Sequence, residues 1–199
     1  MAFTLFPQNE LKLDPVVQYV LPHLKQHPFI KVWDAGCAVG PEPYSIAIAF
    51  RENLGAFQFR NVRIYATDIG EMHFAETIAR GIYPDTELAQ IPRDLFAKYF
   101  KPNGQPSHFQ ANEELRRAVY FHRHDLLSLQ PILNDFGLIV CKNVLPRFTP
   151  AQRADVVRMF HRALARDGYL VLEHAQNLPY GTERLFHRVT PSAQLYRKA

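Results

Sequence analysis

The fold of this protein is decided by residues 29–45, which read F-I-K-V-W-D-A-G-C-A-V-G-P-E-P-Y-S. Phe29 to Trp33 is apolar except at its centre, which predicts a short buried strand. The strand stops at Asp34, glycines follow at positions 36 and 40, and Glu42 to Leu54 then carries apolar residues at helical spacing. This order predicts one unit of a parallel α/β sheet, with a loop between strand and helix that can approach a ligand closely.

The same order of elements recurs along the chain. The other predicted strands are 62–66, 136–142, 169–173, 185–189 and 194–197, and the other predicted helices are 14–26, 70–80, 91–100 and 149–166. A kink is expected at Pro22 and a turn at Asp167-Gly168. Residues 101–110 contain Pro, Gly and Asn, which predicts a small β-hairpin excursion near 101–122.

These elements predict one α/β domain over residues 1–199. Its sheet is expected to be mostly parallel, with helices on both faces. The hairpin excursion and the last two strands are expected to be antiparallel, which places an antiparallel strand at the C-terminal edge of the sheet.

The composition is that of a globular protein, with 47% hydrophobic and 21% charged residues. No run reaches the roughly 18 apolar residues of a membrane helix, and Met1 to Glu10 lacks the features of a signal peptide. We therefore expect a cytoplasmic protein without membrane insertion. The net charge is +4, but basic residues such as Arg116, Arg117 and Arg184 are scattered along the sequence, which argues against a nucleic-acid partner.

The two cysteines, Cys37 and Cys141, are too few for a disulfide framework or a zinc site. Each lies beside the end of a predicted strand, so we expect two small buried side chains and no metal site. The sequence also shows no convincing Ser-His-Asp or Cys-His arrangement for nucleophilic catalysis.

Polar groups follow three successive strands. Gly36 and Gly40 shape the first loop, Asp68 follows the second strand, and Asp125 and Leu126 lie near the end of a third. An acidic residue in the place of Asp68 commonly accepts hydrogen bonds from ribose hydroxyls, and the acceptor of Asp125 could meet an adenine amino group. The pattern suits a nucleoside cofactor. The glycine spacing is not G-x-G-x-x-G, so hydride transfer with a dinucleotide is disfavoured.

Residues 34–45 resemble the signature of the CheR family of chemotaxis-receptor methyltransferases, in which a G-C-S-T-G loop runs into E-E-P-Y-S. Residues 66–69, 79–83, 139–145 and 168–170 also resemble that family, and their order and spacing hold from about Thr4 to Tyr196. The resemblance implies a class I, Rossmann-like methyltransferase fold with S-adenosylmethionine as cofactor and S-adenosylhomocysteine as product. It also implies a protein substrate, a glutamate in the cytoplasmic region of a chemoreceptor.

The resemblance assigns most of the cofactor set to matching residues. It implies that Gly36 and Gly40 shape the cofactor loop, that Glu42 contacts the cofactor and that Asp68 binds its ribose. Asn143 matches the Asn of the family's C-R-N-V segment. The remaining cofactor residues are Asp125, which stands where the family often has Asn, and Leu126.

The acceptor set departs from the family at several positions. Gln8 stands where an Arg closes the family's T-x-F-F-R segment, and Pro41 replaces the first Glu of E-E-P-Y-S. Lys142 replaces the Arg of C-R-N-V, and Arg147 replaces the Tyr of I-Y-F. We expect Lys142 and Arg147 to orient the acceptor, because they still supply positive charge for a carboxylate. His174, just after a predicted strand, is the histidine best placed for a role in the pocket.

Two other functions remain open. The chain could be a non-catalytic adaptor or sensor that binds S-adenosylmethionine or S-adenosylhomocysteine, or an O-methyltransferase for a small molecule. The family carries a helical domain ahead of the T-x-F-F-R segment, at which this chain begins, so we expect that this domain was lost or that a partner supplies its function. Residues 101–110 fall where some members have a β-subdomain that touches a receptor tail.

Overall fold

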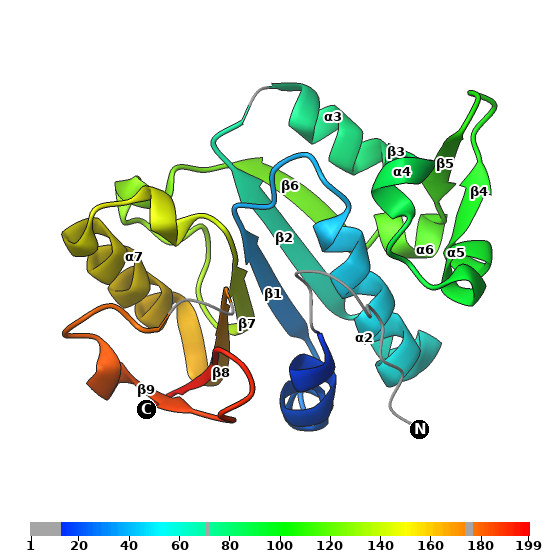
Figure 1. The fold of residues 1–199 in the computed structure, drawn as a ribbon. Coiled ribbons are helices and arrows are strands. Elements are labelled where there is room, and N and C mark those ends of the chain that lie inside the picture. Colours follow the sequence, from blue (N-terminus) through cyan, green and yellow to red (C-terminus); the bar gives the residue numbers. More distant parts are fainter. Residues whose placement is uncertain (1–12, 71, 174–176) are drawn as a thin grey trace.

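The computed structural model describes residues 13–70, 72–173 and 177–199, and its main feature is a seven-stranded sheet in the order β6-β2-β1-β7-β8-β10-β9 (Figure 1). The strands are β1 (Ile30–Ala35), β2 (Val62–Asp68), β6 (Val119–Arg123), β7 (Phe136–Cys141), β8 (Leu164–Leu172), β9 (Phe186–Arg188) and β10 (Leu195–Lys198). The first five strands of this order pair in parallel. Strand β10 pairs antiparallel with β8 and β9. The predicted mostly parallel sheet with an antiparallel C-terminal edge is confirmed.

Helices cover both faces of this sheet because alternate residues of each strand point to opposite sides. On one face, Val32 of β1 belongs to a core that includes η1 (Val16–Val20), α1 (Leu21–Leu24) and α2 (Glu42–Phe59). On the other face, Trp33 belongs to a core with α7 (Pro150–Ala163). Figure 1 shows α2 and α7 on either side of the central strands.

A second sheet of three antiparallel strands lies beside α2, in the order β3-β5-β4. Its strands are β3 (Ile82–Pro84), β4 (Phe100–Pro102) and β5 (His108–Ala111), and the helices around it are α3 (Met72–Arg80), α4 (Asp85–Leu88), α5 (Arg93–Tyr99) and α6 (Glu113–Arg116). The predicted helix 91–100 is therefore present as α5.

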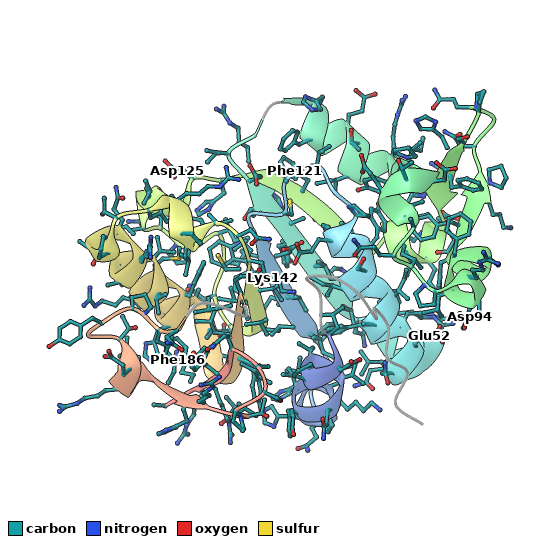
Figure 2. All side chains as sticks on the ribbon, in the orientation of Figure 1. Glu52, Asp94, Phe121, Asp125, Lys142 and Phe186 are labelled. Carbon is teal, nitrogen blue, oxygen red and sulfur yellow. The ribbon has the colours of Figure 1, made fainter. Side chains whose placement is uncertain are left out.

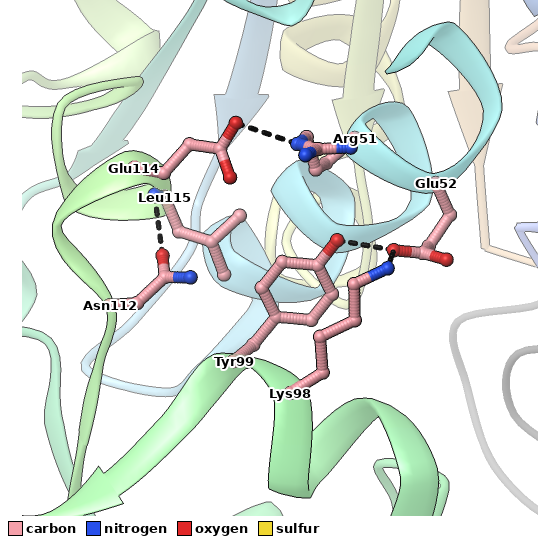
Figure 3. Close-up of polar contacts among 7 residues, drawn as sticks. All are labelled: Arg51, Glu52, Lys98, Tyr99, Asn112, Glu114 and Leu115. Carbon is pink, nitrogen blue, oxygen red and sulfur yellow. Dashed lines mark hydrogen bonds and ion pairs between the residues drawn. The ribbon is translucent and has the colours of Figure 1, made fainter. Parts of the chain in front are cut away.

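Polar contacts fasten this small sheet to α2 (Figure 3). Lys98 Nζ lies 2.6 Å from Glu52 Oε1, and the hydroxyl of Tyr99 donates to the same carboxylate. Arg51 Nε donates to Glu114 Oε1 at 2.6 Å, so α6 is held by the neighbouring residue of α2. Two consecutive α2 residues thus bind two different helices of the smaller sheet.

Three elements are irregular at or near their predicted boundaries. The helix predicted for 14–26 with a kink at Pro22 is helical over residues 14–24, and its middle is a π-helical turn, η1, directly before α1, which contains Pro22. The helix predicted for 42–54 ends where expected, because Gly55 is non-helical (φ 77°, ψ 166°), and a further short helical piece runs from this kink to Phe59. Strand β8 includes Asp167 and Gly168, but its pairing with β7 shifts register between Leu164 and Tyr169, so the strand is irregular where the turn was predicted. A Cβ on Gly168 would lie 2.6 Å from the carbonyl oxygen of Phe136 and 3.2 Å from that of Ala165, so this irregularity requires a glycine.

Short 3₁₀ turns link the remaining elements: η2 (Leu126–Ser128), η3 (Leu145–Arg147) and η4 (Glu183–Leu185). Within residues 13–70, 72–173 and 177–199, no helix is long and apolar enough to cross a bilayer.

Candidate functional site

The candidate site lies at the carboxyl ends of β1, β2 and β7. Chain connections leave β1 in opposite directions, toward β2 and β6 on one side and toward β7 and β8 on the other. In open α/β sheets, ligands bind outside the carboxyl ends of the strands at such a switch point. The residues gathered there are Asp34, Asp68 and Lys142, together with the loop that follows Ala35.

The glycine loop after β1 is closely packed at one end and open at the other. Gly36 has φ 94°, and a Cβ there would lie 2.1 Å from Val144 Cγ2. Its N–H donates to the carbonyl of Thr67 at 2.7 Å, which ties the loop to β2. A Cβ on Gly40 would meet no atom within 4 Å. The free space around Gly40 lets a ligand approach the backbone.

Asp68 bridges the loops that follow β1 and β2. Its Oδ2 accepts from the N–H of Ala38 at 3.0 Å, and its Oδ1 accepts from the N–H of Gly70 at 3.0 Å. An ionised carboxylate has about four acceptor positions, so each oxygen can still accept from a ligand hydroxyl. Asp68 therefore shapes the loop and offers acceptors for a ribose at once.

Asp34 is a buried carboxyl at the centre of the site, with 2% of its surface exposed. Its Oδ2 has no hydrogen-bond partner among the described residues. Burial raises the pKa of Asp34, the charges of Glu42 and Asp68 raise that pKa further, and the charge of Lys142 lowers it. Glu42, in the first turn of α2, thus lies within electrostatic reach of Asp34. Carboxyl groups concentrate on this side of the site, which suits a cationic ligand.

The cations of the site follow β7. Lys142 is only 8% exposed, and Figure 2 places it near the middle of the molecule, beside β1 and β7. The next residue, Asn143, is exposed and has φ 56°, a left-handed conformation that Asn tolerates better than most residues. Arg147 closes η3 and is exposed. Lys142 is therefore buried within electrostatic reach of Asp34, whereas Arg147 is exposed on the segment that follows.

Asp125 and Leu126 follow β6, the strand next to β2. The N–H of His124 donates to the carbonyl of Asp68 at 2.9 Å, which holds this segment beside Asp68. Asp125 is exposed and caps η2, because its Oδ1 accepts from the N–H of Leu127 at 2.8 Å. Leu126 is buried in the core formed with α7. One oxygen of Asp125 is thus engaged in a cap and the other is available to a ligand.

The two cysteines are buried beside the site, at the ends of neighbouring strands. Burial, followed by the charge of Asp34, raises the pKa of the Cys37 thiol well above its usual range. Burial also raises the pKa of Cys141. Both thiols are neutral at physiological pH and therefore poor nucleophiles and metal ligands. In the described parts of the chain, no three His, Cys, Asp or Glu side chains are grouped to hold a metal ion.

Besides the buried Asp34, two further contributors are absent from the sequence-based set of site residues. The hydroxyl of Tyr83, from β3 of the small sheet, donates to the carbonyl of Gly40 at 3.4 Å. The indole N–H of Trp33 donates to Thr67 Oγ1 at 2.8 Å inside the core. Tyr83 belongs to the family-like segment 79–83, but nothing in that segment indicates contact with a loop forty residues earlier.

Two predicted residues cannot be placed. Gln8 and His174 lie in segments 1–12 and 174–176, outside the described residues. The structure brings together Gly36, Gly40, Glu42, Asp68 and Lys142, and it places Asp125, Leu126, Asn143 and Arg147 on the loops that follow β6 and β7.

Comparisons with known proteins show the family of the chain. Residues 2–194 match the family described as "CheR methyltransferase, SAM binding domain". A chemotaxis protein methyltransferase of Borreliella burgdorferi is 32% identical over 88% of this chain and 64% of its own length. A chemotaxis protein methyltransferase 2 of Pseudomonas aeruginosa is 30% identical over 80% of this chain and 57% of its own length. The chain thus spans less than two thirds of the length of these two relatives.

The fold is that of class I methyltransferases. A crystal structure of a methyltransferase from Geobacter sulfurreducens superposes with a TM-score of 0.51 at 14% identity, covering 92% of this chain and 78% of that one. S-adenosylmethionine is the cofactor of the domain that residues 2–194 match. The chain belongs to the CheR methyltransferase family.

Proposed function

We propose that this chain is an S-adenosylmethionine-dependent methyltransferase that acts on a carboxylate, a glutamate of a protein. The observation that carries this proposal is the Asp68 bridge: one carboxylate holds the loops after β1 and β2 at the open side of Gly40. The cations that follow β7 lie across the switch point from this loop.

The described residues fit the cofactor. Gly36 keeps the loop close to Val144, and the empty space at Gly40 leaves room for a ligand against the backbone. We assign the ribose to Asp68, the adenine amino group to Asp125 and the positively charged end of the cofactor to Glu42. The buried Asp34 supports the last assignment, since its Oδ2 has no hydrogen-bond partner among the described residues. Leu126 and Asn143 complete the proposed set.

The chemistry requires little from the protein beyond position and charge. S-adenosylmethionine, when bound, supplies an electrophilic methyl group. A glutamate carboxylate has an ordinary pKa of about 4.3, so it is ionised at neutral pH and needs no general base. In this proposal Lys142 and Arg147 hold that carboxylate in line with the methyl group. The rate enhancement comes from orientation and the exclusion of water. The neutral thiols of Cys37 and Cys141 take no part.

The proposed setting follows the relatives. Proteins named chemotaxis protein methyltransferase support an acceptor in the cytoplasmic region of a chemoreceptor and a cytoplasmic enzyme. We propose that the chain acts as one domain, with the three-stranded sheet as an excursion between α3 and β6.

The first test is a calorimetric titration of ligand-stripped protein with S-adenosylmethionine and with S-adenosylhomocysteine. We expect a Kd in the micromolar range, about −8 kcal/mol. Asp68→Ala removes the acceptor for the ribose and the bridge between the loops, so affinity should fall at least about 100-fold. Asp94→Ala is the matched control, because Asp94 is an exposed aspartate at the start of α5 and should leave binding unchanged.

Unchanged affinity in Asp68→Ala would remove the basis of the pocket assignment. The second test follows radiolabelled methyl transfer into membranes that contain chemoreceptors and, in parallel, into a small-molecule extract. Label in receptor protein supports the proposal, and label in the extract alone contradicts it. Tight cofactor binding without transfer into either would identify a non-catalytic binder.

A further inference from the structure

A second hollow lies at the other end of the sheet, where β2 and β6 begin. It has a volume of about 840 Å³, and its wall contains four arginines, Arg60, Arg63, Arg116 and Arg117. The first two come from the junction of α2 and β2, and the last two from α6 and the turn after it. These basic residues are far apart in the sequence, and the fold brings them together around one concave surface.

Three of the four arginines have no ion pair among the described residues. The wall also contains two glutamates, but each is engaged: Glu113 pairs with Arg117 at 2.5 Å, and Glu114 pairs with Arg51 at 2.6 Å. Figure 3 shows the carboxylate of Glu114 directed toward Arg51 on α2. Arg60, Arg63 and Arg116 therefore leave the hollow with uncompensated positive charge.

The guanidinium groups are partly fixed before any ligand binds. Arg63 Nη1 donates to the carbonyls of Arg60 and Val62, both at 2.8 Å, which orients the group and leaves its other N–H donors available. Arg116 Nε is buried and has no hydrogen-bond partner among the described residues. Arg116 also lines the hollow, so an anion bound there lies near a guanidinium group that has no ion pair among the described residues.

The chemistry of the wall selects phosphate among anions. All four cations are arginines, whose planar forks match phosphate and carboxylate oxygens. A phosphate group presents three terminal oxygens and can accept from several guanidinium groups at once, whereas a single carboxylate serves one or two. The wall also includes Tyr120, which is 41% exposed and stacks on Tyr65 at a centroid distance of 5.9 Å, so a flat ring can extend the stack.

We propose that this hollow is a second binding site, separate from the cofactor site, that takes a phosphate-bearing small molecule. Its volume lies within the range of about 300–1,000 Å³ that is usual for small-ligand sites. Arg63 and Asp68 lie five residues apart on β2, roughly 16 Å along an extended strand, so the two sites are at opposite ends of the sheet. The proposal does not depend on methyl transfer.

The test is a calorimetric titration of the full chain, without cofactor, with pyrophosphate. We expect saturable binding that weakens as sodium chloride is raised, because the site is electrostatic. The variant Arg60→Gln with Arg63→Gln should bind at least about tenfold more weakly. The matched control is Arg166→Gln with Arg184→Gln, which removes the same charge from two exposed arginines of other elements and should bind as the unmodified chain does.

Melting temperatures establish that each variant is folded. If the double variant melts early, Arg60→Gln alone replaces it, because Arg60 is exposed and no side-chain contact of it is present among the described residues. No saturable binding to the unmodified chain, or equal weakening in the control variant, overturns the proposal. An oligonucleotide that binds more tightly than pyrophosphate or ADP, with a salt dependence that grows with its length, also overturns it in favour of a nucleic-acid surface.

Discussion

The two sides of the switch point are built in different ways. On the cofactor side, backbone and carboxylate groups are held by hydrogen bonds: Asp68, for example, accepts from the N–H groups of Ala38 and Gly70 at 3.0 Å each. On the acceptor side, Lys142 and Arg147 follow β7 on a segment that passes through the left-handed conformation of Asn143 and the 3₁₀ turn η3. On the first side two loops are joined by backbone and carboxylate contacts, whereas the second consists of side chains on a single loop.

This difference teaches that the two halves tolerate change unequally. A backbone loop that is packed against its neighbours fails when one atom is added, so its residues cannot drift without loss of the cofactor. Side chains on a loop can be replaced by other cations while still presenting positive charge, which is the pattern seen where Lys142 and Arg147 depart from the family signature. The predictions below test this contrast.

The largest effect is expected from Gly36→Ala. The new methyl group would lie 2.1 Å from Val144 Cγ2 at a residue with φ 94°, so clash and backbone strain act together. We expect a loss of about 2–5 kcal/mol in the free energy of unfolding, together with loss of cofactor binding. Urea denaturation measures the first and calorimetry the second.

Gly40→Ala is the control for that experiment. Its methyl group meets nothing within 4 Å, so stability should change by no more than about 0.5 kcal/mol while cofactor affinity falls. Equal losses of stability in the two variants would show that Gly36 and Gly40 are packed alike, which contradicts the contrast between the two ends of the loop.

Arg147→Ala tests the acceptor side. Removal of this exposed cation should lower the rate of methyl transfer about tenfold or more, because it removes a charge-assisted contact to the acceptor, while the cofactor Kd stays within about twofold. Arg158→Ala, which removes an exposed arginine of α7, should change neither quantity. A parallel fall in cofactor affinity would place Arg147 in the cofactor half instead.

Asp34→Asn probes the boundary between the halves. The pKa of Asp34 is raised in the folded protein, mainly by burial, above its unfolded value of about 3.9. Such a group favours the folded state most below the unfolded pKa and loses this advantage as pH rises through the folded pKa. The Asn variant should therefore be more stable than the parent at pH 7, with a difference that disappears below about pH 4. Denaturation across this pH range measures the difference in stability. A variant less stable than the parent at pH 7 would mean that the attraction between Asp34 and Lys142 outweighs the cost of burying the charge.

The smallest effect is expected from Tyr83→Phe. The bond that it removes is long, 3.4 Å to the carbonyl of Gly40, so stability should fall by less than about 1 kcal/mol and cofactor affinity by no more than about threefold. Tyr99→Phe is the control, since its hydroxyl contacts Glu52 on α2. If affinity changes in the Tyr99 variant alone, the small sheet influences the site through its contact with α2 and not through the Gly40 loop.

Sequence patterns could predict what is contiguous. The strand, glycine loop and helix of residues 29–54 carry their own signals, and Asp68 is recognisable because it directly follows a predicted strand. Features that depend on close packing of distant segments could not be read in this way. The turn signal at Gly168, for example, does not reveal that a Cβ there would lie 2.6 Å from the carbonyl oxygen of Phe136.

The arginine hollow illustrates the same limit. Arg60 and Arg63 precede Arg116 by more than fifty residues, and the two groups become neighbours only when β6 pairs with β2. Charge counted along the sequence therefore appeared dispersed, although the folded protein concentrates it at one end of the sheet.

The buried thiols can report on local opening of the protein. Cys37 and Cys141 are the two cysteines of the sequence, and they are 4% and 0% exposed at the ends of adjacent strands. An alkylating reagent can reach them only during local opening. The labelling rate therefore reports how often the carboxyl ends of β1 and β7 separate. Any molecule that binds across these strand ends slows the labelling rate, whatever its chemistry. Such a molecule can be found because it protects the thiols from alkylation.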